Sequence, residues 1–254
     1  MSPSIWTRCA ARANLRRLGG KAWRVVEAQH VVSTRKLVDS AAEHDLLERL
    51  IEGAKPPQPG GPEFEGLHYL LGTPFRYPPL RHGSRFATRN ERSVWYGSSR
   101  PRTAFAEAAY YRLLFLEGTT ADLEPVTTEL SLFHAKLGSY RGADLTRPPF
   151  DAHRATIASP SCYEETQRMG HDMRNDGVAV FRYPSARDLR GGTNIGLLSP
   201  EAFASRQPSV PETWACVTTR ARVAFVKRDF FERRSIGFPR EDFLVDGQLP
   251  APAP

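Results

Sequence analysis

The chain has a single glutamate inside an alanine-rich segment, TAFAEAAYYR, and this residue sets a strong requirement on the fold around it. The segment predicts a helix, and the positions three and four residues from Glu107 hold only threonine, alanine and tyrosine. No lysine or arginine is therefore placed to pair with the carboxylate along the same helix face. A buried carboxylate is costly unless a partner comes from elsewhere in the fold, and an unpaired one is a candidate for chemistry. A buried salt bridge with a distant arginine is the structural alternative.

The charge balance and the cysteines limit the class of protein. With 35 basic and 28 acidic residues, the chain has a formal net charge of +7. Its pI near 9.6 favours an anionic partner, which can be nucleic acid, a phosphorylated small molecule or an acidic protein. No apolar run approaches the roughly 18 residues of a membrane span, so we expect no membrane crossing. The three cysteines lack CxxC spacing, which indicates neither a disulfide framework nor a zinc site and favours a reducing cytoplasm.

The chain length of 254 residues favours one domain with an arm at each end. Residues 1–20 carry only basic charges and are predicted to form a flexible or packed N-terminal arm. From Lys21 the pattern predicts a short strand and then a helix, capped by Thr34 and ending at Gly53, whose apolar side chains we expect in the core. Residues 236–254 are predicted to be a tail without fixed structure.

Proline and glycine mark the elements of the middle of the chain. Pro101 suits the first turn of a central helix, and Gly118 suits its end. Further along, the pattern predicts a strand near residues 126–134 and a loop over 144–158. A helix is predicted from Ser159, closed by Gly177, and is followed by a buried strand over 178–181 that ends at Pro184. One or two more strands are predicted within 215–234.

Two serines, Ser98 and Ser99, precede the central helix. A loop of small hydroxyl residues that enters a helix N-terminus can bind an anion through free backbone amides. A simple serine cap explains the same residues equally well. The sequence leaves both interpretations open.

Standard catalytic motifs are absent from the sequence: it contains no HExxH, GxSxG, P-loop or GxGxxG pattern. The remaining polar candidates are an arginine, a tyrosine, a glutamate and a serine. An arginine suits a diphosphate, a tyrosine ring orients a flat group, and a carboxylate stabilises positive charge that develops on a ribose. Together they meet the needs of nicotinamide–ribose cleavage, whose oxocarbenium-like transition state resembles that of glycosidases.

The motifs GSRF, WYGS, TAFAEAAYYR and RYPSAR, followed by the asparagine of GGTNIGLLSP, resemble the RES domain family in content and in order. The likeness covers most of residues 21–232. It implies a single α+β domain similar to the ADP-ribosyltransferase fold, with mixed β-sheets flanked by helices. In this interpretation residues 21–235 form the RES domain with an N-terminal helical extension. The family's proteins are toxins of bacterial toxin–antitoxin pairs that destroy NAD by phosphorolysis or hydrolysis, and a few are protein ADP-ribosyltransferases.

The resemblance implies a set of site residues. Arg85, Tyr96, Glu107 and Ser185 fall on the family's catalytic arginine, tyrosine, glutamate and serine, and Asn194 falls on the asparagine that follows. We expect Arg85 to hold a diphosphate or phosphate, Tyr96 to position the nicotinamide ribose and Glu107 to stabilise the ribosyl cation. Substrate-binding residues would be Arg85, Tyr96, Ser98 and Asn194. This chain has GSRF where many members have GGRW, which alters the packing beside Arg85.

The same resemblance implies the partners. NAD is expected as a substrate rather than a cofactor, with inorganic phosphate as a co-substrate and no metal. The expected protein partner is an antitoxin of the Xre helix-turn-helix type that covers the active site and provides the contact with DNA, and a homodimer is also open. Water, phosphate and protein all remain as acceptors. A non-catalytic nucleic-acid binder ranks last, because the basic residues form no dense run with interleaved aromatics.

Overall fold

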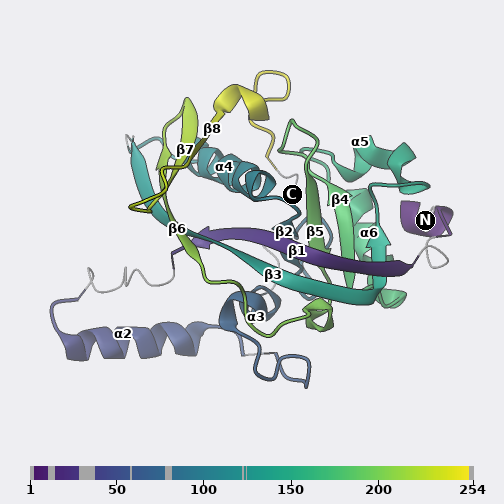
Figure 1. Cartoon of the computed structure of the whole chain (residues 1–254), viewed down its shortest axis with the longest axis horizontal. Coiled ribbons are helices and arrows are strands. Elements are labelled where there is room, and N and C mark those ends of the chain that lie inside the picture. Colours follow the sequence, from purple (N-terminus) through teal and green to yellow (C-terminus); the bar gives the residue numbers. More distant parts are fainter. Residues whose placement is uncertain are drawn as a thin grey trace.

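The computed structural model describes residues 3–10, 15–28, 38–57, 59–77, 82–121, 123 and 125–251. In it the strands join one eight-stranded sheet in the order β1-β2-β5-β4-β3-β6-β7-β8, with helices packed around it (Figure 1). The expected single domain of α+β class is confirmed, with one continuous sheet in place of the several sheets expected. Within these ranges no helix is long and apolar enough to cross a bilayer.

Strand β3 (Val126–Asp144) is the centre of the sheet. It pairs antiparallel with β1 (Arg16–Glu27) and β6 (Glu212–Thr218) and parallel with β4 (Val180–Pro184). Strand β1 also pairs with β2 (Trp95–Ser98), β2 pairs with β5 (Thr193–Leu197), and β5 pairs with β4. These pairings close into a ring, from which β6, β7 and β8 extend. The predicted strand at 126–134 is thus much longer, because pairing with β1 keeps its second half extended.

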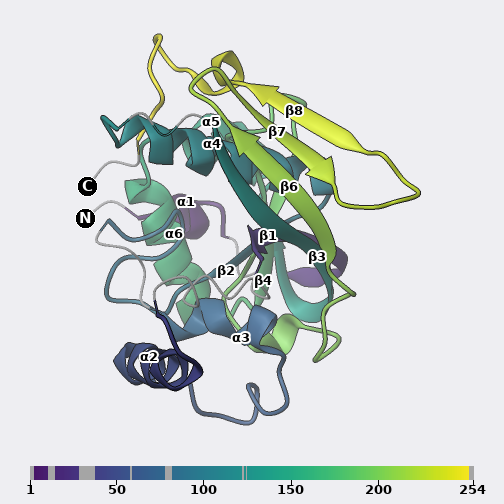
Figure 2. The same ribbon diagram turned by 90° about the vertical axis from the view of Figure 1, so that its left-hand side faces the viewer.

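Helix α4 (Pro101–Glu117) has the start and the end that the sequence predicts, with Pro101 in its first turn and Gly118 at its C-cap. Its apolar residues, among them Phe105, Ala109 and Leu113, join a core cluster with side chains of β3, β6, β7 and β8. The helix lies beside the part of the sheet that β6, β7 and β8 form (Figure 2). Because this packing fixes the position of α4, it also fixes the position of Glu107 on that helix.

The N-terminal residues belong to the domain. Helix α1 (Ile5–Arg8) buries Ile5 and Trp6 and packs on α6 (Glu164–Asn175), where the Trp6 indole donates to Asp176 at 2.7 Å. The predicted boundary between residues 20 and 21 falls inside β1, which begins at Arg16. The strand starts earlier than predicted because Leu18 and Gly19 pair with β3.

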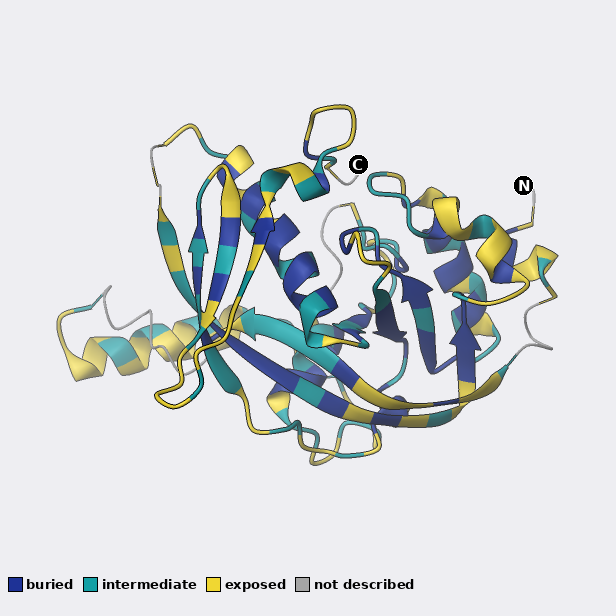
Figure 3. Ribbon diagram, turned by 45° about the horizontal axis from the view of Figure 1, so that its top comes forward, coloured by how far each residue is buried: buried dark blue, intermediate teal, exposed yellow. Residues whose placement is uncertain are grey.

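Helix α2 (Ala41–Ala54) has no buried residue, so the predicted core role is wrong. Leu46 and Leu50 are half or more exposed. Its N-terminus is a capping box at Ser40, and the predicted cap at Thr34 lies outside the described residues. In Figures 1 and 3 the helix projects beside the sheet, with most of its surface exposed.

The connections are more helical than predicted. A helical turn η3 (Phe150–His153) and α5 (Arg154–Ile157) occupy the expected loop, and α6 begins at Glu164 rather than Ser159. Gly177, the predicted helix stop, follows α6 with a φ of 72°, a conformation that favours glycine. The remaining elements of the first half are α3 (Tyr69–Arg76) and β2 (Trp95–Ser98).

The described part of the predicted C-terminal tail, residues 236–251, is folded against the domain. The expected strands within 215–234 are β6 and β7 (Arg222–Lys227), and β8 (Ser235–Pro239) pairs with β7. The turn η5 (Arg240–Phe243) follows, and Phe238, Phe243 and Leu249 join the core cluster on α4. The apolar residues of IGF (Ile236, Phe238) and of DFL (Phe243, Leu244) were the signal for this packing, which the sequence reasoning missed.

Candidate active site

Glu107 lies within α4, and two neutral donors meet its side chain. The Ser185 hydroxyl donates to Oε1 at 2.7 Å, and the Asn194 amide Nδ2 donates to the same oxygen at 2.5 Å. In the described part of the chain Glu107 forms no ion pair, so the alternative of a buried salt bridge is not seen, and no residue there bonds Oε2. The carboxylate is held in one orientation by neutral donors, and its second oxygen is available.

Sheet pairing orients the amide donor. Asn194 on β5 (Thr193–Leu197) lies opposite Ser98 at the end of β2. Both residues are buried, and the Ser98 hydroxyl donates to Asn194 Oδ1 at 2.7 Å. Because the oxygen of the amide is occupied by this donor, its NH₂ group faces Glu107. Ser98 therefore acts on the carboxylate through Asn194.

The loop after β4 orients the serine donor. Ser185 follows the strand directly, and its Oγ accepts hydrogen bonds from the backbone amides of Arg187 and Asp188, each at 3.1 Å. These two donors occupy the lone pairs of the hydroxyl, so its hydrogen is directed to Glu107. The predicted serine thus has a defined donor direction.

A contact with α4 fixes the same loop. Thr103 Oγ1 donates to Asp188 Oδ2 at 2.8 Å, and Gly192 passes close to both. A Cβ atom at Gly192 would lie 2.5 Å from each of those oxygens, which explains the glycine at this position. The loop and the helix are therefore locked together one helical turn from Glu107.

Arg85 is presented by a tight turn. Gly83 has a φ of 74°, Ser84 and Ala87 form an isolated β-bridge, and Phe86 is fully buried between two aromatic rings of β4. The Arg85 guanidinium donates to the carbonyls of Ile157 and Ser159, at 3.2 and 2.7 Å. It has no ion-pair partner among the described residues.

The Tyr96 hydroxyl contacts this turn rather than Glu107. It forms a hydrogen bond with Ser84 Oγ at 2.9 Å and accepts the Phe86 amide at 3.0 Å. Burial raises the pKa of Tyr96 to about 12, although these two hydrogen bonds act in the opposite direction. Tyr96 therefore stays neutral at physiological pH and fixes the backbone on either side of Arg85.

The small-residue loop before α4 is not a serine cap. Ser98 bonds Asn194, the Ser99 hydroxyl donates to the Thr193 carbonyl at 3.0 Å, and Arg100 at the N-cap makes no side-chain cap hydrogen bond. Of the two interpretations that the sequence left open, the simple cap is therefore wrong. Both serines tie β2 to β5.

Sequence reasoning missed the aromatic and cationic neighbours of this cluster. Arg187 is buried with its guanidinium 3.5 Å from the Tyr110 ring centroid, and the Arg85 guanidinium lies 4.4 Å from that of Tyr163. Burial raises the pKa of Tyr110, an effect opposed by Arg187 and Arg85 and reinforced by Tyr163 and Glu107, so these charges share one neighbourhood. The i, i+3 spacing of Glu107 and Tyr110 was an available signal.

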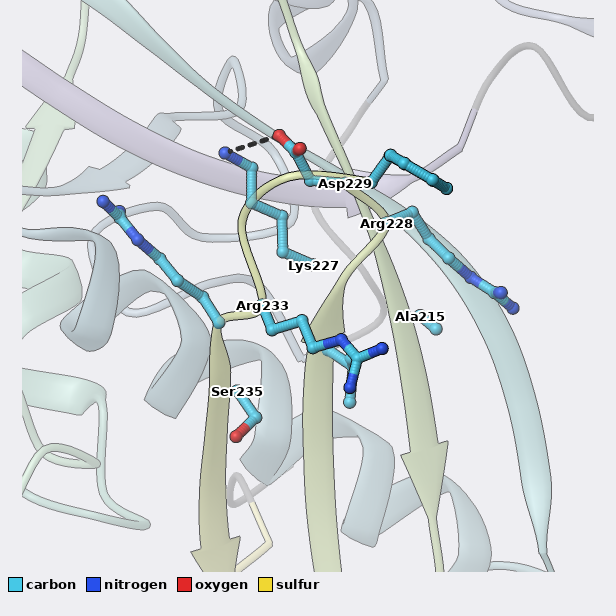
Figure 4. Close-up of a pocket in the computed structure, with 9 residues that line it drawn as sticks. Ala215, Lys227, Arg228, Asp229, Arg233 and Ser235 are labelled. Carbon is cyan, nitrogen blue, oxygen red and sulfur yellow. Dashed lines mark ion pairs between the residues drawn. The ribbon is translucent and has the colours of Figure 1, made fainter.

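A depression of about 650 Å³ lies elsewhere, at the turn between β7 and β8 (Figure 4). Its lining is rich in basic residues and includes none of the predicted site residues. Among the described residues, no group of three or more His, Cys, Asp or Glu side chains is placed to hold a metal ion. Of the predicted site residues, Glu107, Ser185, Asn194 and Ser98 are thus joined in one hydrogen-bonded cluster, whereas Arg85 and Tyr96 make their hydrogen bonds elsewhere.

Comparison with known proteins identifies the family of the chain. The chain has no match among curated proteins. The model of the RES domain family matches residues 63–219, more than half of the chain, and this range includes Arg85, Tyr96, Glu107, Ser185 and Asn194. Strand β1 precedes the match but pairs with β3 in the same sheet. The chain belongs to the RES domain family.

Proposed function

We propose that this chain is the toxin of a toxin–antitoxin pair and that it degrades NAD by cleaving the nicotinamide–ribose bond. The family match is consistent with an NAD-related function of this kind. The observation that carries the proposal is the state of Glu107, whose Oε1 accepts two neutral donors while Oε2 has no partner in the described residues. Such a carboxylate suits the stabilisation of a developing cation.

The chemistry follows from the charges. As the glycosidic bond breaks, its electron pair leaves with the nicotinamide nitrogen, which neutralises the pyridinium without a general acid. Positive charge develops on the ribose, as in glycoside hydrolysis. In our proposal Glu107 Oε2 faces this charge or the ribose hydroxyls, while Ser185 and Asn194 keep the carboxylate from turning away. The anomeric carbon then bonds to an oxygen of phosphate or of water, and with water the released proton passes to solvent.

Two further residues take roles in substrate binding. Arg85 carries an unneutralised charge beside the Tyr163 ring, an arrangement that suits a phosphate group of NAD. Tyr96 has both of its hydroxyl contacts on the turn that contains Arg85, so we assign it the positioning of that arginine. Its ring remains available to the nicotinamide ribose, as the sequence suggested.

The net charge of +7 suits an acidic antitoxin, and we propose a helix-turn-helix protein of the Xre type, which would also make the contact with DNA. The site would then act on the NAD of the cytoplasm once the antitoxin is lost. Transfer of ADP-ribose to a protein is the second candidate, because an unoccupied Glu107 oxygen serves that reaction equally well.

The test is incubation of the purified chain with NAD, with and without inorganic phosphate, followed by mass analysis of the products. Phosphate-dependent nicotinamide release with an ADP-ribose phosphate product would establish a phosphorylase. Release with free ADP-ribose would establish a hydrolase, and ADP-ribose attached to protein a transferase. A folded, antitoxin-free sample that releases no nicotinamide would contradict the proposal.

A further inference from the structure

Two arginines from distant parts of the chain meet the same short segment, Ile157–Pro160. Arg85 Nη1 donates to the carbonyls of Ile157 and Ser159, and Arg187 Nη2 donates to the carbonyl of Pro160 at 2.5 Å. Neighbouring residues lie about 4 Å apart along the chain, so the two guanidinium groups lie within roughly 10 Å of each other. The segment therefore holds two cations side by side.

The contacts that hold these arginines do not neutralise them. Their partners are backbone carbonyls and the ring faces of Tyr163 and Tyr110. In the ranges that the structure describes, neither guanidinium pairs with a carboxylate. Other arginines of the chain do: Arg112 pairs with Glu27 at 2.8 Å and Arg240 with Glu117 at 2.9 Å.

Burial makes the charge on Arg187 unusual. The residue is 4% exposed, and a buried cation is costly unless an anion balances it. In the structure Glu107 forms no ion pair with Arg187, and its Oε1 accepts hydrogen bonds from Ser185 and Asn194 instead. The amide of Arg187 also bonds Ser185 Oγ, so the loop that orients Glu107 also places Arg187. Because no carboxylate of the described residues pairs with Arg187, a bound anion is well suited to supply the balancing negative charge.

We propose that Arg85 and Arg187 together form a site for phosphoryl groups. Each guanidinium has further N–H donors in a planar fork, which matches the oxygens of a phosphate or diphosphate. The proposal rests on the proposed function for the identity of the ligand, since the diphosphate of NAD and free inorganic phosphate share this chemistry. It assigns Arg187, which the predicted site omitted, to substrate binding.

The experiment is calorimetric titration of the full chain with pyrophosphate and with inorganic phosphate. We expect pyrophosphate to bind the wild type and to bind Arg85→Met and Arg187→Met at least about tenfold more weakly, as for the loss of a charge-assisted hydrogen bond. The matched control is Arg17→Met, which removes an arginine 5.3 Å from the Tyr140 ring, outside this site, and should leave binding unchanged.

The two anions distinguish the two possible ligands, the diphosphate of NAD and free inorganic phosphate. Weaker binding of pyrophosphate by Arg187→Met, with a higher KM for NAD, assigns the pair to the diphosphate. If Arg187→Met weakens the binding of inorganic phosphate but not of pyrophosphate, the two arginines bind the phosphate that acts as the acceptor of the reaction. Unchanged binding of both anions by folded Arg187→Met overturns the proposal.

A crystal structure of the wild type with pyrophosphate provides the test if that variant does not fold. Density within hydrogen-bond distance of both guanidinium groups is expected, and density elsewhere or none overturns the proposal. Both measurements need no turnover. A chain that binds pyrophosphate through both arginines but leaves NAD intact would therefore contradict the proposed function and support this site.

Discussion

Two regions of the molecule differ in the partners of their charged side chains: one pairs opposite charges, and the other surrounds a charge with neutral donors. Near the turn between β7 and β8, Lys227 lies within ion-pair distance of three carboxylates, Glu232 at 2.8 Å, Asp229 at 3.3 Å and Glu212 at 3.9 Å. Figure 4 shows the pair with Asp229. Its pKa is raised, first by the hydrogen bond with Glu232. Around Glu107 the partners are a serine and an asparagine, which orient the charge and do not cancel it.

The difference separates charge that supports the fold from charge that is available to a ligand. The partners of Lys227 are a third or more exposed, and ion pairs near the surface contribute little to stability and are screened by salt. A carboxylate oriented by neutral donors has no such role, because the hydroxyl and amide would be equally satisfied by an uncharged acceptor. Substitutions that place a charge beside Glu107, or that remove the charge of Lys227, test this difference.

The largest effect is expected from Asn194→Asp, which puts a second carboxylate beside Glu107. Like charges at hydrogen-bond distance cannot both ionise without strong repulsion, so the pair shares a proton at low pH and loses it as pH rises. At pH 9 we expect NAD turnover at least about a hundredfold below the wild type, with partial recovery at pH 5. Steady-state rates across this range measure it.

Asn194→Ala is the control for this variant. It removes the donor and adds no charge, so we expect a loss of roughly tenfold that has the pH dependence of the wild type. Equal rates for Asn194→Asp and the wild type at pH 9 would show that turnover does not require an uncharged partner of Glu107 at position 194.

A smaller effect is expected from Tyr96→Phe, which removes the hydroxyl that bonds Ser84 and the Phe86 amide. The freed groups beside Arg85 should cost about 1–3 kcal/mol in the free energy of unfolding. Urea unfolding measures this loss, and Tyr140→Phe, at an exposed tyrosine, is the control. If both variants were equally stable, the Tyr96 hydroxyl would not support the turn.

The same residue predicts a dependence on pH. The pKa of Tyr96 is raised by burial to about 12, above its ordinary value near 10. The stability that it contributes is therefore fully present below about pH 10 and is lost as the pH rises towards 12. We expect the unfolding free energy of the wild type to fall more steeply between about pH 10 and pH 12 than that of Tyr96→Phe. Parallel curves would contradict this assignment.

The smallest effect is expected from Lys227→Met. Its ion pairs are near the surface, so we expect a shift in melting temperature that is smaller than that of Tyr96→Phe and that shrinks further in high salt. NAD turnover should not change, since the side chain is outside the Glu107 cluster. A loss of turnover would show that the two regions are coupled.

The sequence predicts the local parts of this account and misses the long-range parts. Pro101 and Gly118 set the ends of α4 correctly, because those signals act within one helical turn. The exposure of α2 was missed, since an apolar stripe does not reveal whether any surface covers it. The folded C-terminal residues were missed for the converse reason: Phe238 and Phe243 are buried by α4, which is more than a hundred residues earlier in the chain.

The candidate site shows the same division. The odd position of Glu107 is visible in the sequence, whereas its donors Ser185 and Asn194 come from 78 and 87 residues later in the chain. Periodicity contains no information on that pairing, and only the resemblance to a family pointed to both residues. Arg187 was missed because nothing in RYPSAR distinguishes a buried, unpaired arginine from a solvated one.

The most direct test compares two substitutions of the same kind in one assay. Nicotinamide release from NAD is measured for Glu107→Gln and for Glu232→Gln, each of which removes one carboxylate charge. We predict that Glu107→Gln folds and loses turnover by about a thousandfold, while Glu232→Gln retains the rate of the wild type. A folded Glu107→Gln variant with full turnover would contradict the claim that the charge held by Ser185 and Asn194 performs the reaction.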